Sequence, residues 1–349
     1  MLHEDENDCD SFGSSSSWKR RLEATRSMPS LHQGNLSASI FILVGFPGLG
    51  EVHCWLAFLL CFLFALALLG NSTIIYIVSV ERSLHQPMYL FLCMLAATDI
   101  MISLSTMPKM MAITGFNSTS ITFDACLLQM FCIHSLSGME STILLAMSLD
   151  RYIAICYPLS HSSILTGPRI AKIGLVAVIR GAAVMASLPV FIKRLPFCQS
   201  NVLSHPYCLH QDVMKLACAS IKLNVIYGLV VIIFAIGLDS LLISLSYIFI
   251  LKAALSLSQE ARLKALGTCF SHLSAVFLFY VPFIGLSMVH RFQETHGSNS
   301  HTVLANLHLL VPPVLNPLVY GVKTKEIRCR VIRSFHRIIL RRTFQNSRS

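Results

Sequence analysis

The chain has 349 residues, of which 54% are hydrophobic and only 13% charged, with a net charge of +10 and a mean hydropathy of +0.65. Soluble domains are about one-quarter charged, so this composition excludes an ordinary soluble protein and indicates a polytopic membrane protein. The basic residues gather in short loops and in the C-terminal tail without an accompanying aromatic groove, so the charge does not indicate a nucleic-acid-binding protein.

The first 54 residues form a polar N-terminal arm. It is acidic at first, then serine-rich and then basic, and it contains no apolar stretch that would make a cleavable signal peptide. We therefore expect residues 1–54 to be extracellular and largely disordered, with the first span acting as its own signal. Asn35 begins an Asn-Leu-Ser sequon ahead of that span, and we expect it to be glycosylated, although sequons also occur by chance.

Seven apolar runs follow, each close to the ~20 residues that a membrane-spanning helix needs. They predict an all-α membrane protein, a seven-transmembrane helix bundle over residues 55–322 that is followed by a cytoplasmic segment, 323–349. The predicted spans are 55–80, 88–112, 125–152, 171–192, 223–251, 263–290 and 303–322. Because seven is an odd number, the two ends of the chain should lie on opposite sides of the membrane.

The Lys and Arg residues give the orientation. Of the 27 in the chain, most lie in the tail and in the short loops on the tail's side of the bundle. By the positive-inside rule that side is cytoplasmic, so we expect a multi-pass plasma-membrane protein with an extracellular N-terminus.

Several predicted spans contain ionisable residues, which are costly in lipid and therefore mark candidate functional sites. The third span holds His134 and Glu140, and the triplet Asp150-Arg151-Tyr152 ends it. Arg180 in the fourth span and Asp239 in the fifth should each face another helix, but the sequence identifies no partner for either.

Four cysteines are candidates for disulfides. Cys126 lies at the outer mouth of the third span, and Cys198, Cys208 and Cys218 lie in the long loop between the fourth and fifth spans. In an oxidising compartment four cysteines allow three pairings, and the residues alone do not choose among them.

The tail begins with an amphipathic pattern over residues 324–342. Ile327, Val331, Phe335 and Ile338 or Ile339 recur every three to four residues among arginines. This predicts a short eighth helix that lies on the anionic inner leaflet, with a solvated helix as the alternative.

Three residues suggest a site for a small ligand. His134 lies eight residues past Cys126, about 12 Å below the outer mouth, which is the depth of a cavity between helices, although a lone His is more often a core residue. Ser287 and Arg291 are four residues apart near the outer end of the sixth span, so they share a helix face. The forked guanidinium of Arg291 matches a carboxylate, and a solvated loop charge is the alternative.

The joint placement of two motifs resembles a rhodopsin-like G-protein-coupled receptor: Asp150-Arg151-Tyr152 ends the third span, and Asn316-Pro317-Leu318-Val319-Tyr320 ends the seventh. Other stretches are similar to odorant receptors, and two of them to the class I (fish-like) receptors, most of all to olfactory receptor family 51, subfamily E. The odorant-receptor stretches are LHQPMY from Leu84, MSLDRYIAICYPL from Met147 and KALGTCFSHL from Lys264. The class I stretches are LPFCQSNVLSHPYCLHQDVMKLAC from Leu195 and FIGLSMVHRF from Phe283.

The resemblance covers roughly residues 40–340 and has departures. The N-terminal arm is long. Ser148-Leu149 and the run 157–160, Tyr-Pro-Leu-Ser, stand where the class more usually has Ala-Phe and His-Pro-Leu-Arg. These changes lie on the cytoplasmic coupling surface and should alter coupling efficiency.

The resemblance implies two disulfides, Cys126 with Cys208 and Cys198 with Cys218, which would pin the loop as a lid over the outer ends of the helices. It also implies that small volatile carboxylic acids, short- to medium-chain fatty acids, are the ligands. The positions that would hold the acid group are His134, Gln211, Ser287 and Arg291.

Deeper in the bundle, Asp99 and Glu140 cannot both stay charged without a cation or a proton. The resemblance implies a sodium ion there, with Asn71 and Asn316 nearby; a proton shared by the two acids is the alternative. We expect no other cofactor and no other metal.

The resemblance further implies that Asp150, Arg151, Tyr152 and Tyr320, together with the segment 264–273, couple the bundle to a stimulatory, olfactory-type heterotrimeric G protein and so raise cyclic AMP. Activation would then be a ligand-biased population shift in which the sixth helix moves outward.

Three other classes of protein were weighed. A receptor of the same fold for a non-acid odorant is the nearest. A solute transporter would show inverted repeats or paired broken segments, and we find neither in the sequence. A zinc enzyme would show clustered His, Cys or carboxylate ligands, which are also missing from the sequence, so we expect no enzyme.

Overall fold

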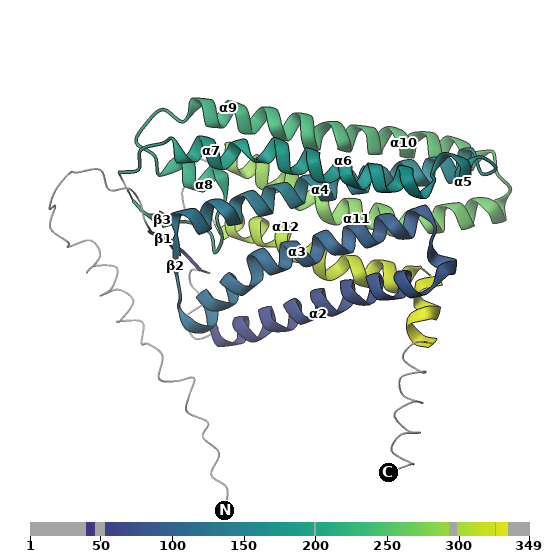
Figure 1. Ribbon diagram of the computed structural model, residues 1–349, viewed down its shortest axis with the longest axis horizontal. Helices are drawn as coiled ribbons and strands as arrows, with labels where there is room; N and C mark the ends of the chain where they lie inside the picture. Colours follow the sequence, from purple (N-terminus) through teal and green to yellow (C-terminus); the bar gives the residue numbers. More distant parts are fainter. Residues whose placement is uncertain (1–39, 46–52, 199, 293–298, 325, 334–349) are drawn as a thin grey trace, which may run out of the picture.

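The computed structural model describes residues 40–45, 53–198, 200–292, 299–324 and 326–333. The earlier part of the arm, including the expected glycosylation site Asn35, lies outside these residues. Long helices run side by side along the molecule (Figure 1). In chain order they are α2 (His53–Val80), α3 (Pro87–Phe116), α4 (Phe123–Cys156), α6 (Gly167–Met185) with α7 (Ser187–Lys193), α9 (Lys222–Val231) with the π-helical turn η3 (Ile232–Gly237) and α10 (Leu238–Leu255), α11 (Gln259–Phe292) and α12 (Asn299–Lys323).

Each of the seven predicted spans falls inside one of these helical rods. Within the described residues, six rods are long and apolar enough to cross a membrane; α12, which carries buried Asn306, His308 and Asn316, is not among them. The lipid-facing helices expose large apolar side chains such as Phe62 on α2 and Ile179 on α6. Such apolar surfaces are unusual on a protein in water, but they are expected where helices contact the hydrocarbon chains of a bilayer.

Helix α4 is the centre of the bundle. Two-thirds of its most apolar window is buried (67%), against 22% for α2 and 28% for the rod formed by α6 and α7. It contacts α3, α6, α10 and α11. Polar residues on α4 therefore meet other helices rather than lipid.

One end of the bundle carries a small sheet that the all-α prediction missed. Strand β1 (Ile40–Leu43) pairs antiparallel with β2 (Ser120–Thr122) and parallel with β3 (Val202–Leu203). Phe41 and Leu43 on β1 are fully buried, and the Phe41 ring lies 5.7 Å from that of Phe123 and 5.9 Å from that of Phe197. This short part of the arm is thus ordered by pairing with two loops that lie far away in the sequence.

The loop between α7 and α9 forms a lid at this same end. It contains β3, helix α8 (His210–Lys215) and both disulfides. We call this the lid end, and the opposite end, where α5 (His161–Ile164) lies, the tail end (Figure 1).

At the tail end, the chain turns after α12 into a second helix, of which residues 326–333 are described. Ile327 is 1% exposed, so the expected apolar face does pack inward. Arg330 Nη1 lies 2.8 Å from Glu81 Oε2, beside the 3-10 turn η2 (Arg82–Leu84). The predicted eighth helix is therefore present, and its expected extension to residue 342 lies outside the described residues.

Beneath the lid lies a compact group of buried apolar side chains, which we call the sub-lid cluster. It joins residues of the lid to residues of five helices. Its members are Leu60, Ile102, Met110, Ile133, Leu136, Tyr207, Leu209, Leu286, Ala305 and Leu309.

Candidate functional site

Two disulfides fix the lid to the bundle. Cys126 at the start of α4 is bonded to Cys208, with a Cα–Cα distance of 5.5 Å, and Cys198 is bonded to Cys218 within the lid. This is the pairing that the family resemblance implied and that the residues alone left open.

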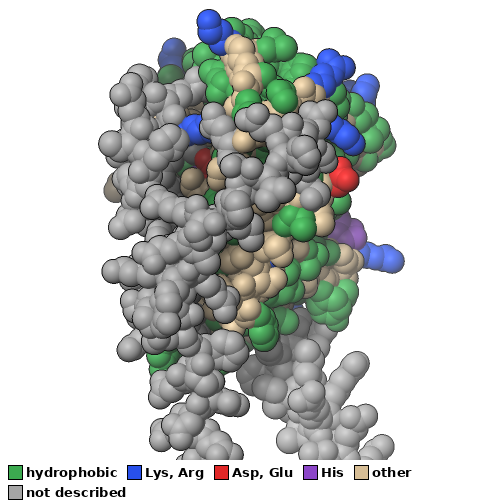
Figure 2. Space-filling model, turned by 90° about the vertical axis from the view of Figure 1, so that its left-hand side faces the viewer, with side chains coloured by type: hydrophobic (Ala, Val, Ile, Leu, Met, Phe, Trp, Pro, Cys, Tyr) green, Lys and Arg blue, Asp and Glu red, His purple; other side chains and the backbone are tan. Residues whose placement is uncertain are grey.

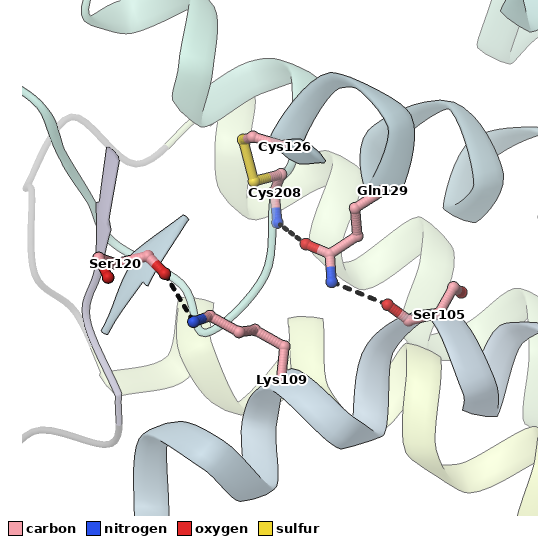
Figure 3. The surroundings of a disulfide bond; sticks show 6 residues. All are labelled: Ser105, Lys109, Ser120, Cys126, Gln129 and Cys208. Carbon is pink, nitrogen blue, oxygen red and sulfur yellow. Dashed lines mark hydrogen bonds between the residues drawn. A yellow bond between two sulfur atoms is a disulfide. The ribbon is translucent and has the colours of Figure 1, made fainter. Parts of the chain in front are cut away.

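A glutamine that the sequence analysis passed over completes this anchor. Gln129 lies one turn past Cys126, so both side chains leave the same face of α4. Its Oε1 accepts a hydrogen bond from the Cys208 N–H at 3.0 Å, and its Nε2 donates to the Ser105 carbonyl on α3 at 2.8 Å (Figure 3). The lid is thereby held to two helices, directly above the sub-lid cluster.

Lys109 makes a parallel connection to the sheet. From α3 its Nζ donates to the carbonyl oxygen of Ser118 at 2.8 Å, and to that of Ser120 at 2.7 Å (Figure 3). The sheet and the lid are therefore both tied to α3, which makes the lid end a rigid cap.

Three of the four expected ligand residues are close neighbours in the chain of members of the sub-lid cluster. His134 on α4 follows Ile133, Ser287 on α11 follows Leu286, and Gln211 on α8 is two residues from Leu209; all three side chains are half-buried. The backbone of Arg291 lies in the last turn of α11, and its side chain lies outside the described residues. Nε2 of His134 is buried and has no hydrogen-bond partner among the described residues.

Two more buried histidines, which were not singled out from the sequence, are next in the chain to the cluster members Leu209 and Leu309. His210 on α8 is 5% exposed and packs against Gly228 of α9, where an added Cβ would lie 3.8 Å from the imidazole. Burial lowers the pKa of His210 to about 3, and the nearby His134 adds to the shift, so His210 is neutral. His308 on α12 is 7% exposed, with its ring 5.0 Å from that of Phe283.

Tyr207 brings a phenol to this group of polar side chains. It is a member of the sub-lid cluster and is fully buried. Burial raises the pKa of Tyr207 well above its usual value, and the negative charge of Asp212 adds to the shift. Asp212 is itself hydrogen-bonded to His205, so the lid carries a buried polar pair beside the cluster.

The residues expected to bind a cation lie close together, deeper in the bundle. Asn316 Nδ2 on α12 donates to Asp99 Oδ2 on α3 at 3.0 Å, and Asp99 lies close enough to Glu140 on α4 to repel it. Asn71 on α2 donates to the Pro313 carbonyl of α12 at 2.9 Å. All four side chains are at most 3% exposed.

These four residues leave only acceptor atoms unused. Asn71 Oδ1, Asp99 Oδ1, Glu140 Oε1 and Asn316 Oδ1 are buried and have no hydrogen-bond partner among the described residues. Oxygens without donors are what a hard cation requires, and a single shared proton would satisfy only some of them. The donor set therefore fits a small cation.

Arg180 and Asp239, whose partners the sequence could not name, are partners of each other. Arg180 Nη1 on α6 lies 2.7 Å from Asp239 Oδ2 on α10 and donates to Thr142 Oγ1 of α4 at 2.6 Å. Arg180 Nη2 donates to the Ala235 carbonyl at 2.6 Å. Ala235 lies in η3, where the π-helical pattern leaves carbonyls without their usual α-helical partners. Arg180 therefore also supplies a hydrogen-bond donor to this π-helical turn.

Further hydrogen bonds connect this ion pair to α11. Ser141 Oγ donates to Asp239 Oδ2 at 2.8 Å and lies 2.9 Å from the hydroxyl of Tyr280 on α11. Polar contacts thus link α6, α10, α4 and α11 in one buried network, between the sub-lid cluster and the tail end.

At the tail end, Asp150 holds two partners. Arg151 Nη2 lies 3.7 Å from Asp150 Oδ2. His161 Nε2, on α5, lies 2.8 Å from Asp150 Oδ1 and was not anticipated. The ring of Tyr152 lies 6.1 Å from that of Phe249 of α10 and is tilted against it. Tyr320 is fully buried, with no hydrogen-bond partner for its hydroxyl among the described residues.

A pocket of about 530 Å³ lies beside His161 at this end. It is bounded by α5 and by the turn that precedes α3. The lining residues are His85, Gln86, Pro87, His161, Ser162, Leu165, Thr166 and Gly167.

His272, inside the motif-bearing segment 264–273, locks α11 to its neighbours. Its Nε2 lies 3.0 Å from the Leu144 carbonyl of α4, and its Nδ1 lies 2.6 Å from the hydroxyl of Tyr247 on α10. A carbonyl can only accept, so Nε2 carries the proton and Nδ1 accepts from Tyr247. Movement of this end of α11 must break both contacts.

Comparison with known proteins agrees with this arrangement. A model of the family described as "Olfactory receptor" matches residues 60–338. Human Olfactory receptor 51E1 is 69% identical over 300 residues, 86% of this chain and 94% of that protein. Mouse Olfactory receptor 51E2 is 54% identical over 302 residues, and human Olfactory receptor 51D1 is 55% identical over 305, each with the same two coverages.

Such relatives are receptors and not enzymes, and the six strongly apolar helices make this chain a multi-pass membrane protein. The matched region takes in the lid and nearly all of the seven helical rods. The chain therefore belongs to the olfactory receptor family of rhodopsin-like G-protein-coupled receptors.

Proposed function

We propose that this olfactory receptor binds small carboxylic acids, short- to medium-chain fatty acids, at the plasma membrane and activates a stimulatory heterotrimeric G protein, raising cyclic AMP. The lid end faces the outside and the tail end the cytoplasm. Two observations support this orientation: both disulfides lie at the lid end, where an oxidising compartment would form them, and the basic loops lie at the other.

The ligand assignment is supported by the sub-lid cluster, because its members Ile133, Leu209 and Leu286 lie within two residues of His134, Gln211 and Ser287 in the chain. Arg291 follows Ser287 by four residues in the same helix, α11, which is the spacing of about one helical turn. A carboxylate desolvated there is costly unless it is paired, and a guanidinium supplies two parallel donors that match it. Lys and Arg side chains lie along the upper and right-hand edges of the lid end (Figure 2), where they attract anions from solution.

The apolar side chains of the cluster would receive the hydrocarbon tail. Each methylene that leaves water contributes about 0.8 kcal/mol until the space is filled. Potency should therefore rise with chain length by roughly fourfold per methylene and then stop abruptly.

The ligand signal would pass through the buried network to the tail end. Tyr280 lies seven residues, about two turns, before Ser287 on α11, and its contact with Ser141 connects this helix to Asp239. A shift of α11 that favours the ligand-bound state would release His272 from Leu144 and Tyr247 and free Arg151 for the G protein.

A sodium ion bound by Asp99, Glu140, Asn71 and Asn316 would supply the positive charge that lets both carboxylates stay ionised. The fit rests on the four buried oxygens described above. The asparagine contacts to α3 and to the Pro313 carbonyl hold this oxygen set in place in the resting bundle.

A cyclic-AMP reporter in cells that express Arg291→Ala tests the acid assignment. Loss of the charge should abolish the response to fatty acids, because the carboxylate would be buried without a cation. Arg291→Lys is the matched variant: it keeps the charge and loses the fork, so it should retain a weakened response. An unchanged dose–response curve for Arg291→Ala at equal surface level would remove the assignment, and activation by alcohols alone would indicate a receptor for non-acid odorants.

A further inference from the structure

Three polar atoms around the sub-lid cluster have no role in the acid site as proposed. They are the Tyr207 hydroxyl, Nε2 of His210 and Nδ1 of His308, and each is buried without a hydrogen-bond partner among the described residues. Their side chains are 0%, 5% and 7% exposed. A buried polar atom left unpaired costs about 1–3 kcal/mol, so three such atoms in one place call for a partner.

The three side chains come from separate segments, and each belongs to the sub-lid cluster or is next in the chain to one of its members. Tyr207 belongs to the cluster itself, and its other members include the chain neighbours Leu209 of His210 and Leu309 of His308. His134 interacts electrostatically with both histidines, which sets all three imidazoles close together. The same cluster adjoins Ser287, so these atoms surround the place where the acid's hydrocarbon tail would lie.

A plain fatty acid leaves these atoms unsatisfied. Its only polar group is the carboxylate, which the proposed site assigns to Arg291 and its neighbours. Every carbon beyond it would face a mixed wall, apolar at Ile133 and Leu286 but polar at His308 and Tyr207.

We propose that Tyr207, His210 and His308 bind a second polar group on the ligand, a hydroxyl or oxo oxygen, so that hydroxy and oxo acids are the preferred ligand class. This rests on the proposed function, because it places the carboxylate in the acid site.

The chemistry of the three groups selects a neutral oxygen. A neutral imidazole has one donor and one acceptor nitrogen, and a phenol can do both, which matches a hydroxyl that also does both. No cation belongs to this trio, so a second carboxylate would be buried unpaired. Dicarboxylic acids should therefore be excluded, although they carry more oxygen.

The test compares ligands of one chain length in cells expressing the full chain with a cyclic-AMP reporter. The ligands are pentanoic acid, its 2-hydroxy, 3-hydroxy and 4-oxo derivatives, and pentanedioic acid. The most potent derivative should have an EC50 roughly three- to tenfold below that of pentanoic acid, the change expected for one neutral hydrogen bond, and pentanedioic acid should be inactive.

Variants of His308 test whether this residue causes the preference for hydroxy and oxo acids. His308→Phe keeps a ring against Phe279 and Phe283 and removes both nitrogens, so the advantage of the derivative should vanish while pentanoic acid still acts. His308→Asn restores a hydrogen-bonding side chain and should recover part of the preference. Leu307→Ala, one residue away on the exposed face of α12, is the matched control and should change nothing.

The readout is a ratio of two EC50 values in the same cells, so it does not depend on surface level. Equal potency of all derivatives and pentanoic acid, or a preference that survives His308→Phe, would overturn the inference and leave the acid receptor intact. A receptor that responds to none of these acids would overturn both.

Discussion

Separating Arg180 from Asp239 should destabilise the receptor more than any other single charge removal in the described bundle. Asp239 is 2% exposed, and its Oδ2 accepts from both Arg180 and Ser141. Asp239→Leu removes the carboxylate and leaves the guanidinium among apolar helices. Arg180→Met removes the guanidinium and strands the carboxylate with Ser141 as a donor, and it also releases the Ala235 carbonyl in η3.

The size of the destabilisation depends on whether an unpaired charge remains in the bundle. Removing one partner of a buried ion pair costs about 3–5 kcal/mol, because the remaining charge is uncompensated. Removing both and refilling the space with apolar side chains avoids that cost, so the double variant should be more stable than either single variant. The interaction energy from the double-mutant cycle should be at least about 2 kcal/mol.

The assay is unfolding of the detergent-solubilised receptor in a denaturing detergent, with surface level in cells as a second readout. Lys172→Met, which removes a positive charge from an exposed position of the same helix, is the matched control and should stay within about 0.5 kcal/mol of wild type. Additive single effects, or single variants as stable as Lys172→Met, would refute the reasoning.

Three other outcomes follow from the structure. Cys126→Ala with Cys208→Ala opens a loop of 82 residues, which should cost about 4 kcal/mol by the chain-entropy estimate and lower the thermal stability of the receptor; equal melting temperatures with and without the disulfide would contradict this. His210 has a pKa of about 3 in the fold and about 6.5 when unfolded, so the stability it contributes is complete above pH 6.5 and is lost as the pH falls toward 3; His210→Gln should flatten a melting-temperature profile taken from pH 7 to 5, and a parallel profile would count against the buried neutral imidazole. Replacing sodium with a bulky organic cation should shift ligand-free signalling, and Asp99→Asn should remove that shift; insensitivity of the wild-type receptor to the exchange would argue for a shared proton.

The helices were predictable because their signal is local. A run of about twenty apolar residues reports a span wherever it occurs, and each predicted span lies inside its helix within a few residues at each end. The amphipathic pattern of the tail was equally local, and residues 326–333 are helical as it predicted.

Long-range pairings were not predictable in this way. The four residues Ile40–Leu43 carry no distinctive pattern, and their strand exists only because loops some eighty and one hundred and sixty residues later lie beside it. Arg180 and Asp239 each indicated a buried partner on cost alone, yet nothing in either segment pointed to the other. The disulfide pairing came from resemblance, because spacing left three possibilities.

Within the site, the sequence identified residues with an obvious chemical role and missed those whose role is set by neighbours. His134 was found by its depth on a central helix. His210, His308 and Gln129 were missed because the sequence around them does not show that the histidines would be buried with an unpaired nitrogen, or that Gln129 would bond to the lid. Burial of unpartnered polar atoms is a tertiary property.

The most direct test of the central claim, that a carboxylate under the lid activates this receptor, is a comparison of fatty acids with their methyl esters and matching alcohols in the cyclic-AMP reporter. The free acids should activate, and the esters and alcohols of equal chain length should be weaker by at least a hundredfold, since an unpaired buried guanidinium is left behind. Esters as potent as the acids would contradict the claim.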